Sequence, residues 1–464
     1  MDESISHIFR SYDIRGVFGL DLTSEVAYDL GSAFGTLIGE GKTVYVARDY
    51  RKGGEELERS FIEGVASVGT NVVKIGVLPT PVYYFALMTG SADGGAMITA
   101  SHNPPEWEGF KMSREKGKTI GEGFGMEELK GIFMGKAFKA SPAKGTVSND
   151  ENVKERYIRY ATSKVKLKRK LKVVIDPGNG AWSKMASDIF RMLGCEVFEI
   201  NGNPDPLFSG RGPNPTDDAL EGLREAVKDK SADFGCAFDA DGDRVSFVDE
   251  KGNIVGAGGT AVSIFAASYC KKYPGAKIVY DMPCSMSVEE TVRSLGGKPI
   301  PSKTGHVYMM NAMEKEGAVF GGEYSNHLYF AENFNLDDGC FAALKMAEML
   351  AYGNDTLSRL AASITRYPAI PIKELFCPDD IKFRVLEETK PQFAKMGFRI
   401  LDIDGIKMLN DNGWVLVRAS NTMPQIKINS EGKTDEDAAR LFSLAEKVVM
   451  DKINEHMKQE PQTQ

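Results

Sequence analysis

The chain alternates between short apolar strand patterns and amphipathic helix patterns, and this alternation constrains its fold more than any other feature. A strand pattern at 43–47 is followed by a helix pattern at 55–68 and a second strand pattern at 71–75. Such alternation is typical of α/β layers, in which helices cover a sheet. The alternation restarts at 172, and again near 258, where a helix pattern precedes the strand pattern at 277–280. We therefore expect three similar α/β units.

The C-terminal part of the chain follows a different pattern. Strand patterns at 398–403, 413–418 and 425–430 come in succession, and a long helix pattern runs from 434 to about 456. This order predicts a smaller α+β domain. The 464 residues, 42% of them hydrophobic, also exceed what one core normally uses. We predict four domains, at residues 1–151, 152–253, 254–366 and 367–464.

Charge and cysteine usage narrow the function classes. A formal net charge of -8 argues against a dedicated nucleic-acid binder, which needs a concentrated basic surface. The six cysteines are widely spaced without a Cys-x-x-Cys pair, which indicates neither a zinc site nor a disulfide framework. The sequence contains neither a secretory signal pattern nor an apolar run of transmembrane length. We expect a cytoplasmic protein that binds small molecules and has no membrane partner.

The segment Asp-Ala-Asp-Gly-Asp-Arg at 239–244 is the strongest candidate for chemistry. Its three carboxylates, on Asp239, Asp241 and Asp243, can converge on one hard cation. Mg²⁺ prefers a few carboxylates together with phosphate oxygens, and the planar guanidinium of Arg244 suits phosphoryl oxygens. The pattern therefore predicts a magnesium site that handles phosphate.

Two other interpretations of this segment are a solvated turn and an EF-hand loop. In isolation an acidic hexapeptide is most often a solvated turn. An EF-hand loop would place its ligands at Asp239, Asp241, Asp243 and Glu250, but its sixth position needs glycine and here holds Arg244. The flanking patterns at 234–238 and 245–248 also predict strands rather than helices. A metal loop between two strands is the reading we retain.

A second polar loop, Thr-Ala-Ser-His-Asn-Pro-Pro at 99–105, follows the strand pattern at 94–98. Pro104 and Pro105 fix the backbone and remove donors, so the loop is stiff. Ser101 would be held at its tip with His102 beside it. A serine held in this way can carry a phosphoryl group, although a turn with a capping serine has the same pattern.

These residues resemble the α-D-phosphohexomutases, in particular their phosphomannomutase/phosphoglucomutase branch, over essentially the whole chain. The loops at 99–104 and 239–244 resemble the family's phosphoserine and metal loops. Gly-Gly-Glu-Tyr-Ser-Asn-His at 321–327 resembles its sugar-recognition loop. Arg-Ala-Ser-Asn-Thr-Met-Pro at 418–424 resembles its phosphate-binding loop, and Phe-Arg-Ser-Tyr-Asp-Ile-Arg-Gly at 9–16 its N-terminal signature.

The resemblance implies four domains around a central cleft, three related mixed α/β domains plus a smaller C-terminal α+β domain. The implied activity is reversible interconversion of hexose 1-phosphate and hexose 6-phosphate. Ser101 would be the phosphorylated carrier, and a hexose 1,6-bisphosphate would be both intermediate and activator. The C-terminal domain would close over the bound sugar.

The resemblance also implies a set of site residues. Ser101, His102, Lys111 and Arg244 would be catalytic, and Mg²⁺ would be held by Ser101 with Asp239, Asp241 and Asp243. Substrate would contact Tyr12, Arg15, Thr304, Gly305, His306, Glu323, Ser325, His327, Arg418, Ser420, Asn421 and Thr422. Glu323 and Ser325 would read the sugar hydroxyls, while Arg418 and its neighbours would hold the phosphate that does not react. No residue is assigned as the general base.

Two positions depart from the family pattern, and a third distinguishes this chain from the phosphoglucosamine branch. Some relatives carry a lysine immediately before Cys284, where this chain has Pro283, so a proton-handling role at that position is excluded. Asn326 replaces a frequent glycine, and asparagine tolerates the left-handed backbone that such a turn needs. Met423 occupies a place where phosphoglucosamine mutases more often have glutamate.

Other functions stay open at this stage. Glucosamine phosphate is the alternative substrate, although the segment at 420–422 favours the mannose/glucose branch. A non-catalytic sugar-phosphate binder on the same fold is disfavoured because Ser101 and the three aspartates are all present. The sequence decides neither between monomer and dimer nor between Mg²⁺ and Mn²⁺.

Overall fold

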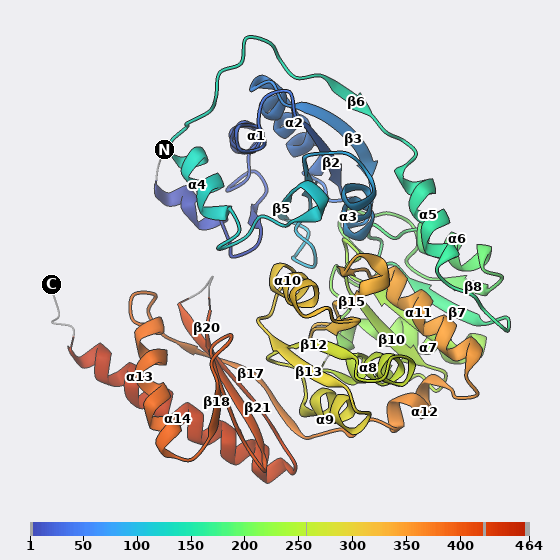
Figure 1. Cartoon of the computed structure of the whole chain (residues 1–464), viewed down its shortest axis with the longest axis vertical. Helices are drawn as coiled ribbons and strands as arrows, with labels where there is room; N and C mark the ends of the chain where they lie inside the picture. Colours follow the sequence, from blue (N-terminus) through green and yellow to red (C-terminus); the bar gives the residue numbers. More distant parts are fainter. Residues whose placement is uncertain (1–2, 257, 421–423, 460–464) are drawn as a thin grey trace. The chain divides into compact units, whose positions relative to one another are not determined.

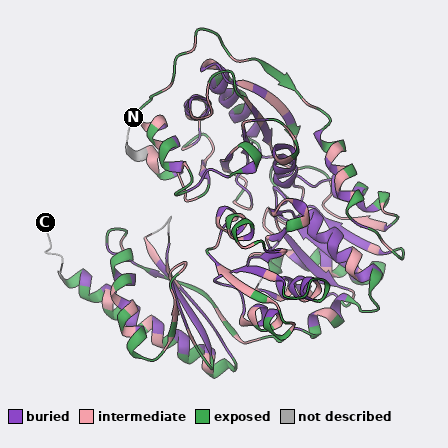
Figure 2. Cartoon of the chain, in the orientation of Figure 1, coloured by how far each residue is buried: buried purple, intermediate pink, exposed green. Residues whose placement is uncertain are grey.

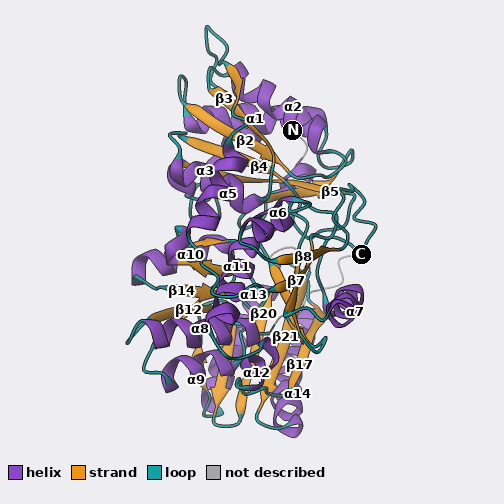
Figure 3. Cartoon of the chain, turned by 90° about the vertical axis from the view of Figure 1, so that its right-hand side faces the viewer, coloured by secondary structure: helices purple, strands orange, loops and turns teal. Residues whose placement is uncertain are grey.

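The computed structural model describes residues 3–256, 258–420 and 424–459. Within these ranges the chain forms two compact units. The first contains Met1–Ala257 and Ser325–Ala362, and the second contains Gly258–Tyr324 and Ser363–Gln464. In both units the strands form sheets flanked by helices (Figure 3). No helix among the described residues is long and apolar enough to cross a lipid bilayer.

The first unit begins with a six-stranded sheet in the order β1-β5-β4-β2-β3-β6. β2 pairs in parallel with β3 and β4, whereas β5 is antiparallel to both β4 and β1. The connection from β4 to β5, residues 99–106, therefore starts at the carboxyl end of β4. The strands are β1 (Ile14–Val17), β2 (Thr43–Arg48), β3 (Asn71–Val77), β4 (Gly94–Ile98), β5 (Trp107–Arg114) and β6 (Val147–Asn149).

Helices α1 (Ser24–Ile38) and α2 (Gly54–Ser67) approach each other unusually closely because each carries a glycine at the crossing. A Cβ on Gly31 would lie 2.1 Å from the carbonyl oxygen of Phe61, and a Cβ on Gly64 would lie 2.0 Å from that of Tyr28. Their inner faces pack on the sheet in one buried core (Figure 2). Helices α3 (Thr80–Thr89) and α4 (Met126–Met134) complete this part of the unit.

The second sheet of this unit has the order β11-β10-β9-β7-β8. β9 and β10 form an antiparallel hairpin whose residues are all buried, and residues 239–244 connect them. The strands are β7 (Lys172–Asp176), β8 (Glu196–Glu199), β9 (Phe234–Phe238), β10 (Val245–Asp249) and β11 (Ile254–Val255). The helices are α5 (Val153–Ser163), α6 (Met185–Met192) and α7 (Glu221–Lys230).

The segment Ser325–Ala362 returns to the first unit and packs against the β9–β10 hairpin. It contains β15 (Leu328–Phe330), β16 (Leu336–Asp337), α11 (Gly339–Tyr352) and α12 (Leu357–Ala362). Asp338 caps α11 by accepting a hydrogen bond from the backbone of Phe341, and it also accepts one from Tyr157 of α5. A Cβ on Gly339 would lie 2.6 Å from the carbonyl oxygen of Arg244, so only glycine permits this contact.

The second unit contains a parallel set of strands followed by an antiparallel sheet. β12 (Lys277–Asp281) lies between β13 (Lys298–Ser302) and β14 (Phe320–Gly322), with helices α8 (Thr260–Lys272), α9 (Met286–Ser294) and α10 (His306–Glu316). The antiparallel sheet has the order β17-β21-β20-β19-β18, and α13 and α14 share its core (Figure 1). Its elements are β17 (Ala369–Phe376), α13 (Lys382–Lys395), β18 (Arg399–Leu401), β19 (Ile406–Asn410), β20 (Gly413–Ala419), β21 (Gln425–Gly432) and α14 (Asp435–Gln459).

The expected fold class is confirmed, with three sheets of α/β type and a C-terminal antiparallel sheet covered by helices. The strand patterns at 43–47, 71–75 and 413–418 correspond to β2, β3 and β20. The strand expected at 398–403 is shorter, because β18 ends at Leu401 and a turn follows before β19. The four domain boundaries stay a prediction.

Candidate active site

The acidic loop between β9 and β10 gathers three buried carboxylates. Oxygen atoms of Asp239, Asp241 and Asp243 all lie within 4.8 Å of one another. The turn depends on Gly242, whose φ of 83° is left-handed and whose carbonyl accepts a hydrogen bond from the indole of Trp182. The backbone N–H groups of Gly242 and Arg244 donate to Asp239 Oδ1 at 3.0 and 3.1 Å. The loop's own backbone thus holds the Asp239 carboxylate in place.

The burial and mutual repulsion of these three carboxylates favour the binding of a cation. Burial, together with the charges of Asp243 and Asp241, raises the pKa of Asp239 well above its usual range. Asp241 Oδ1 is buried and accepts no hydrogen bond from the described residues. Crowded carboxylates with an unsatisfied buried oxygen are the donor set that a hard divalent ion takes. The residues present therefore fit such an ion.

Lys111 of β5 places its ammonium between two of these carboxylates. Its Nζ lies 2.7 Å from Asp241 Oδ2 and 2.6 Å from Asp243 Oδ2. Burial lowers the pKa of Lys111, but the two carboxylates outweigh burial and hold it well above the usual value. Burial likewise opposes ionisation of Asp243, yet Lys111 and His327 lower its pKa well below the ordinary range. Lys111 is therefore a fixed positive charge beside the loop.

Ser101 reaches the same carboxylates from the loop between β4 and β5. Its side chain is buried, its φ of 51° is left-handed, and its Oγ donates to Asp239 Oδ2 at 3.3 Å. His102 Nδ1 lies 3.2 Å from the same Oγ. Burial and the nearby charges of Arg244 and Arg15 lower the pKa of His102 well below its ordinary value, which favours a neutral imidazole.

Arg15 and Thr80 support these two loops. The Arg15 guanidinium donates to Asn103 Oδ1 at 2.7 Å and to the carbonyl of Ala100 at 3.0 Å. Thr80, the first residue of α3, donates from Oγ1 to Asp241 Oδ2 at 2.7 Å. Arg15 was predicted as a substrate contact, whereas Thr80 was not predicted at all. The sequence signal for Thr80 was a Thr-Pro pair at the start of a helix after a strand, which is not specific.

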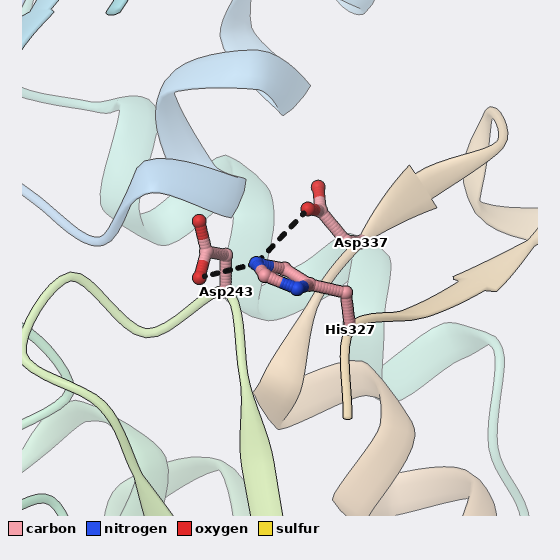
Figure 4. Close-up of side chains that lie close together, drawn as sticks. All are labelled: Asp243, His327 and Asp337. Carbon is pink, nitrogen blue, oxygen red and sulfur yellow. Dashed lines mark ion pairs between the residues drawn. The ribbon is translucent and has the colours of Figure 1, made fainter. Parts of the chain in front are cut away.

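His327 lies between Asp243 of the acidic loop and Asp337 (Figure 4). Its Nε2 is 3.2 Å from Asp243 Oδ1 and 3.9 Å from Asp337 Oδ2, and its Nδ1 is 2.8 Å from Ser325 Oγ. Arg244 Nε also donates to this ring at 3.4 Å. The structure thus brings Ser325 and His327 to the carboxylates. Asp337 was not predicted, and it belongs to none of the motifs that the sequence offered.

A second set of predicted residues comes together in the second unit. Glu323 is buried, and its Oε1 accepts a hydrogen bond from the backbone of Gly305 at 2.8 Å. Thr304 Oγ1 donates to Asp281 Oδ2 at 3.0 Å. Burial and the charge of Glu323 raise the pKa of Asp281 to about 6. The carboxylates of Asp281 and Glu323 therefore both accept hydrogen bonds from the Thr-Gly-His segment at 304–306. Asp281 was not predicted.

Arg418 belongs to the same unit and is joined to Thr304 through Asp404. Its guanidinium donates to Asp404 Oδ2 at 2.8 Å, and the backbone of Thr304 donates to the same oxygen at 3.4 Å. Ser420 is buried, and its backbone donates to the carbonyl of Gln425. The other two predicted phosphate contacts, Asn421 and Thr422, lie outside the described residues.

The remaining predicted residues are placed less tightly. Tyr12 is 39% exposed, and His306 is the first residue of α10. Asn326 has a φ of 64°, which confirms that asparagine supports the left-handed turn expected there. The carbonyls on either side of Pro283 accept hydrogen bonds from Lys407 Nζ, at 2.6 Å from Met282 and 3.3 Å from Cys284.

Comparisons with known proteins match this chain throughout its length. Models of the four phosphoglucomutase/phosphomannomutase domains match in order: the α/β/α domains I, II and III at residues 6–140, 155–252 and 258–367, and the C-terminal domain at 377–447. These matches agree with the four domains expected from the sequence.

Curated relatives and a solved structure match to a similar extent. A phosphomannomutase/phosphoglucomutase from Pseudomonas syringae pv. tomato is 34% identical over 94% of this chain and 93% of its own length. A probable phosphoglucosamine mutase from Methanococcoides burtonii is 36% identical over 96% and 100%. The crystal structure of a phosphoglucomutase/phosphomannomutase family protein from Burkholderia thailandensis matches with a TM-score of 0.89, 31% identity, and 96% and 98% coverage.

Proposed function

Because the chain belongs to the phosphoglucomutase/phosphomannomutase family, we propose that it interconverts hexose 1-phosphates and hexose 6-phosphates, with Ser101 as the phosphoryl carrier. The observation that carries this proposal is the hydrogen bond of 3.3 Å from Ser101 Oγ to Asp239 Oδ2 inside the carboxylate cluster. It joins a potential phosphate carrier to a potential metal site across 138 residues of sequence. A serine that only stabilised its own loop would not need this partner.

The reaction would proceed in two transfers. In the first, the P–O bond to phosphorylated Ser101 breaks, a new P–O bond forms to the free hydroxyl of the bound sugar phosphate, and that hydroxyl loses its proton. The resulting 1,6-bisphosphate then reorients within the site, so that its other phosphoryl group faces Ser101. In the second, its other phosphoryl group returns to Ser101 and the product hydroxyl regains a proton. No phosphate is released to water in either transfer.

Each neighbouring group has a role suited to its charge. Mg²⁺ held by Asp239, Asp241 and Asp243 would neutralise charge on the transferring phosphoryl group. Lys111 and Arg244 would add fixed positive charge on the same side. The imidazole of His102, 3.2 Å from Ser101 Oγ and kept neutral by its lowered pKa, is suited to exchange a proton with that oxygen.

Substrate recognition is assigned to the remaining predicted residues. Glu323, with Ser325 and His327, would bind the sugar hydroxyls, and Thr304, Gly305 and His306 would complete that surface. The phosphate that does not react would be held by Arg418 with the small polar residues 420–422. Tyr12 and Arg15 would contact substrate near the serine loop. A hexose 1,6-bisphosphate would serve as activator by phosphorylating Ser101.

Glucosamine phosphate is the second candidate substrate. The specific observation in its favour is the 36% identity to a probable phosphoglucosamine mutase, slightly above the identity to the Pseudomonas syringae relative. The segment at 420–422 favours the mannose/glucose branch instead. The proposal includes a cytoplasmic location and small-molecule partners, and it leaves the oligomeric state open.

Phosphorus NMR tests the proposal and chooses among the substrates. Mannose 1-phosphate, glucose 1-phosphate and glucosamine 1-phosphate would be incubated separately with the protein, Mg²⁺ and a trace of glucose 1,6-bisphosphate. The expected result is a 6-phosphate signal, with relative rates that identify the preferred sugar. Absence of conversion of all three sugars by folded protein would contradict the proposed function, and release of inorganic phosphate would indicate a phosphatase.

A further inference from the structure

A buried arginine, Arg51, binds the backbone of the loop that carries Ser101. Arg51 follows β2, and its side chain is fully buried. Its two terminal nitrogens donate to four backbone carbonyls, three of that loop and one of the first residue of β5. The acceptors are Ser101 at 2.6 Å, Asn103 at 2.7 Å, Pro104 at 2.7 Å and Trp107 at 3.0 Å.

Asp49 connects Arg51 to the backbone N–H of Ser101 by way of Thr99. Its Oδ2 lies 3.3 Å from Arg51 Nε and accepts a hydrogen bond from Thr99 Oγ1 at 2.6 Å. Thr99 Oγ1 in turn accepts one from the Ser101 N–H at 2.9 Å. Asp49 Oδ1 accepts from the Arg51 backbone at 2.9 Å. Both the N–H and the carbonyl of Ser101 are therefore tied to the same arginine–aspartate pair.

The guanidinium is supported on its face by Phe208, from the connection that follows β8. Its centre lies 5.0 Å from the centre of the Phe208 ring, and this ring is buried. Phe208 itself has a left-handed φ of 51°, which is rare for an aromatic residue. Backbone hydrogen bonds hold it there, since Phe208 N–H donates to the carbonyl of Asp205 and the Phe208 carbonyl accepts from Gly212.

These contacts matter because the backbone conformation of Ser101 is strained. A left-handed backbone at a residue with a side chain costs about 1–2 kcal/mol, and such a conformation persists only where its surroundings hold it. The left-handed turn directs Ser101 Oγ to Asp239. An arginine is suited to this task because its planar fork of five N–H groups serves several carbonyls at once, whereas a lysine ammonium is a compact point charge with three rotatable donors and no fork.

We propose that Arg51 is a positioning residue for phosphoryl transfer, which holds the Ser101 loop in its strained conformation without touching substrate. This inference rests on the proposed function for its kinetic consequence only. Its structural consequence, rigidity of residues 99–107, is measurable whatever reaction the protein catalyses. Arg51→Lys, which keeps the charge but loses the fork, is the variant that tests it.

The first test is hydrogen–deuterium exchange of the full-length protein followed by mass spectrometry. We expect faster exchange in peptides covering 99–107 of Arg51→Lys, with peptides of the C-terminal sheet unchanged. Leu223→Ala is the matched control, because it creates a cavity in a separate buried cluster behind β9. Unchanged exchange at 99–107 in folded Arg51→Lys would overturn the inference, whether or not the wild type is a mutase.

The second test is steady-state kinetics with the preferred hexose 1-phosphate. Misplacing a reacting atom by about 1 Å can cost about 10²-fold in rate, so we expect kcat of Arg51→Lys to fall by about that factor. KM should change less than about threefold, because sugar contacts are intact. A kcat of folded Arg51→Lys equal to that of the wild type would contradict the inference. The inference would also be contradicted if Leu223→Ala, at the same thermal stability as Arg51→Lys, lost as much kcat as Arg51→Lys does.

Phe208→Leu keeps the inference testable if Arg51→Lys does not fold. This variant retains every hydrogen bond of the guanidinium and removes only the ring beneath it. We expect kcat to fall about threefold to tenfold, with faster exchange at 99–107. Unchanged kcat and exchange in Phe208→Leu would then count against Arg51 as the residue that holds the loop.

Discussion

At the residue scale, the position of Asp241 depends on a hydroxyl from a distant part of the sequence. Thr80 Oγ1 donates to Asp241 Oδ2 at 2.7 Å, while Lys111 contacts the same oxygen. These two partners leave Asp241 Oδ1 as the oxygen without a hydrogen bond from the described residues. The carboxylate is thus oriented by groups on one side and presents its other oxygen for a cation.

We predict that Thr80→Val weakens metal binding. Loss of a group that orients a metal-binding carboxylate typically costs about 10–100-fold in metal affinity or activity. Thr89→Val is the matched control, because Thr89 lies on the same helix and donates only to the carbonyl of Phe85 among the described contacts. Titration of Mn²⁺ by electron paramagnetic resonance would measure the affinity. Equal affinity of Thr80→Val and Thr89→Val would contradict the orienting role.

Glu108 gives a second prediction at this scale, on stability. Its carboxyl group is buried, and burial together with the charge of Asp49 raises its pKa to about 8. The ordinary value is 4.5, so the folded state binds the proton more tightly than the unfolded state does. The stabilisation is fully present below pH 4.5 and is lost as the pH rises towards 8.

Glu108→Gln should remove this pH dependence. The free energy of unfolding of the variant, relative to the wild type, should rise between pH 5 and pH 8 by up to about 1.4 kcal/mol per pH unit. Urea denaturation at several pH values would measure it, with the exposed Glu127→Gln as control. Parallel pH profiles for wild type and Glu108→Gln would show that Glu108 ionises equally in the folded and unfolded states.

Much of the site could be predicted from single loops, because the serine loop and the acidic loop are each continuous in sequence. The residues that support these two loops could not be predicted in this way. Thr80 is 161 residues from Asp241, and Arg51 is 50 residues from Ser101, so only the folded sheet order brings them together. A lone threonine or arginine carries no periodic signal that would reveal such a contact.

At the element scale, the start of α11 forms part of the wall behind the acidic loop. Gly339 contacts the backbone of this loop so closely that a Cβ would lie 2.6 Å from the carbonyl oxygen of Arg244 and 3.0 Å from that of Gly242. The helix therefore cannot keep its place with any larger residue at its first position. Asp337 and the cap Asp338 immediately precede this contact and depend on it for their positions.

We predict that Gly339→Ala destabilises the first unit and displaces the acidic loop. Overpacking of this kind costs about 1–3 kcal/mol, and the loop shift should also lower affinity for Mn²⁺. Gly222→Ala is the control, because Gly222 lies in α7 with no atom within 4 Å of the added Cβ. That substitution should be neutral or stabilising. Equal thermal stability of the two variants would contradict the contact.

The sequence patterns predicted the buried elements better than the exposed ones. β9 and β10 are continuous buried strands and were expected at their observed positions. β17 and α13 were missed. β17 is an edge strand that is mostly exposed and lacks alternation, and α13 contains Pro391, which normally ends a helix. Tertiary packing on the C-terminal core overrides both signals.

At the scale of the whole molecule, the repeated α/β pattern was sufficient to predict four domains. Three sheets with parallel strand pairs precede an antiparallel one, and family models match all four parts. Within the second unit, Lys407 of β19 ties the last sheet to the end of β12 through the carbonyls of Met282 and Cys284.

The central claim is that Ser101 carries the phosphoryl group. The most direct measurement is intact-protein and peptide mass spectrometry after incubation with Mg²⁺ and glucose 1,6-bisphosphate whose phosphoryl groups carry ¹⁸O, followed by a rapid chase with unlabelled hexose 1-phosphate. We predict one labelled phosphoryl group on the peptide that contains Ser101, its replacement by an unlabelled phosphoryl group during the chase at a rate no slower than kcat, and no modification of Ser101→Ala. Turnover of hexose phosphates by a protein in which Ser101 never becomes phosphorylated would contradict the account.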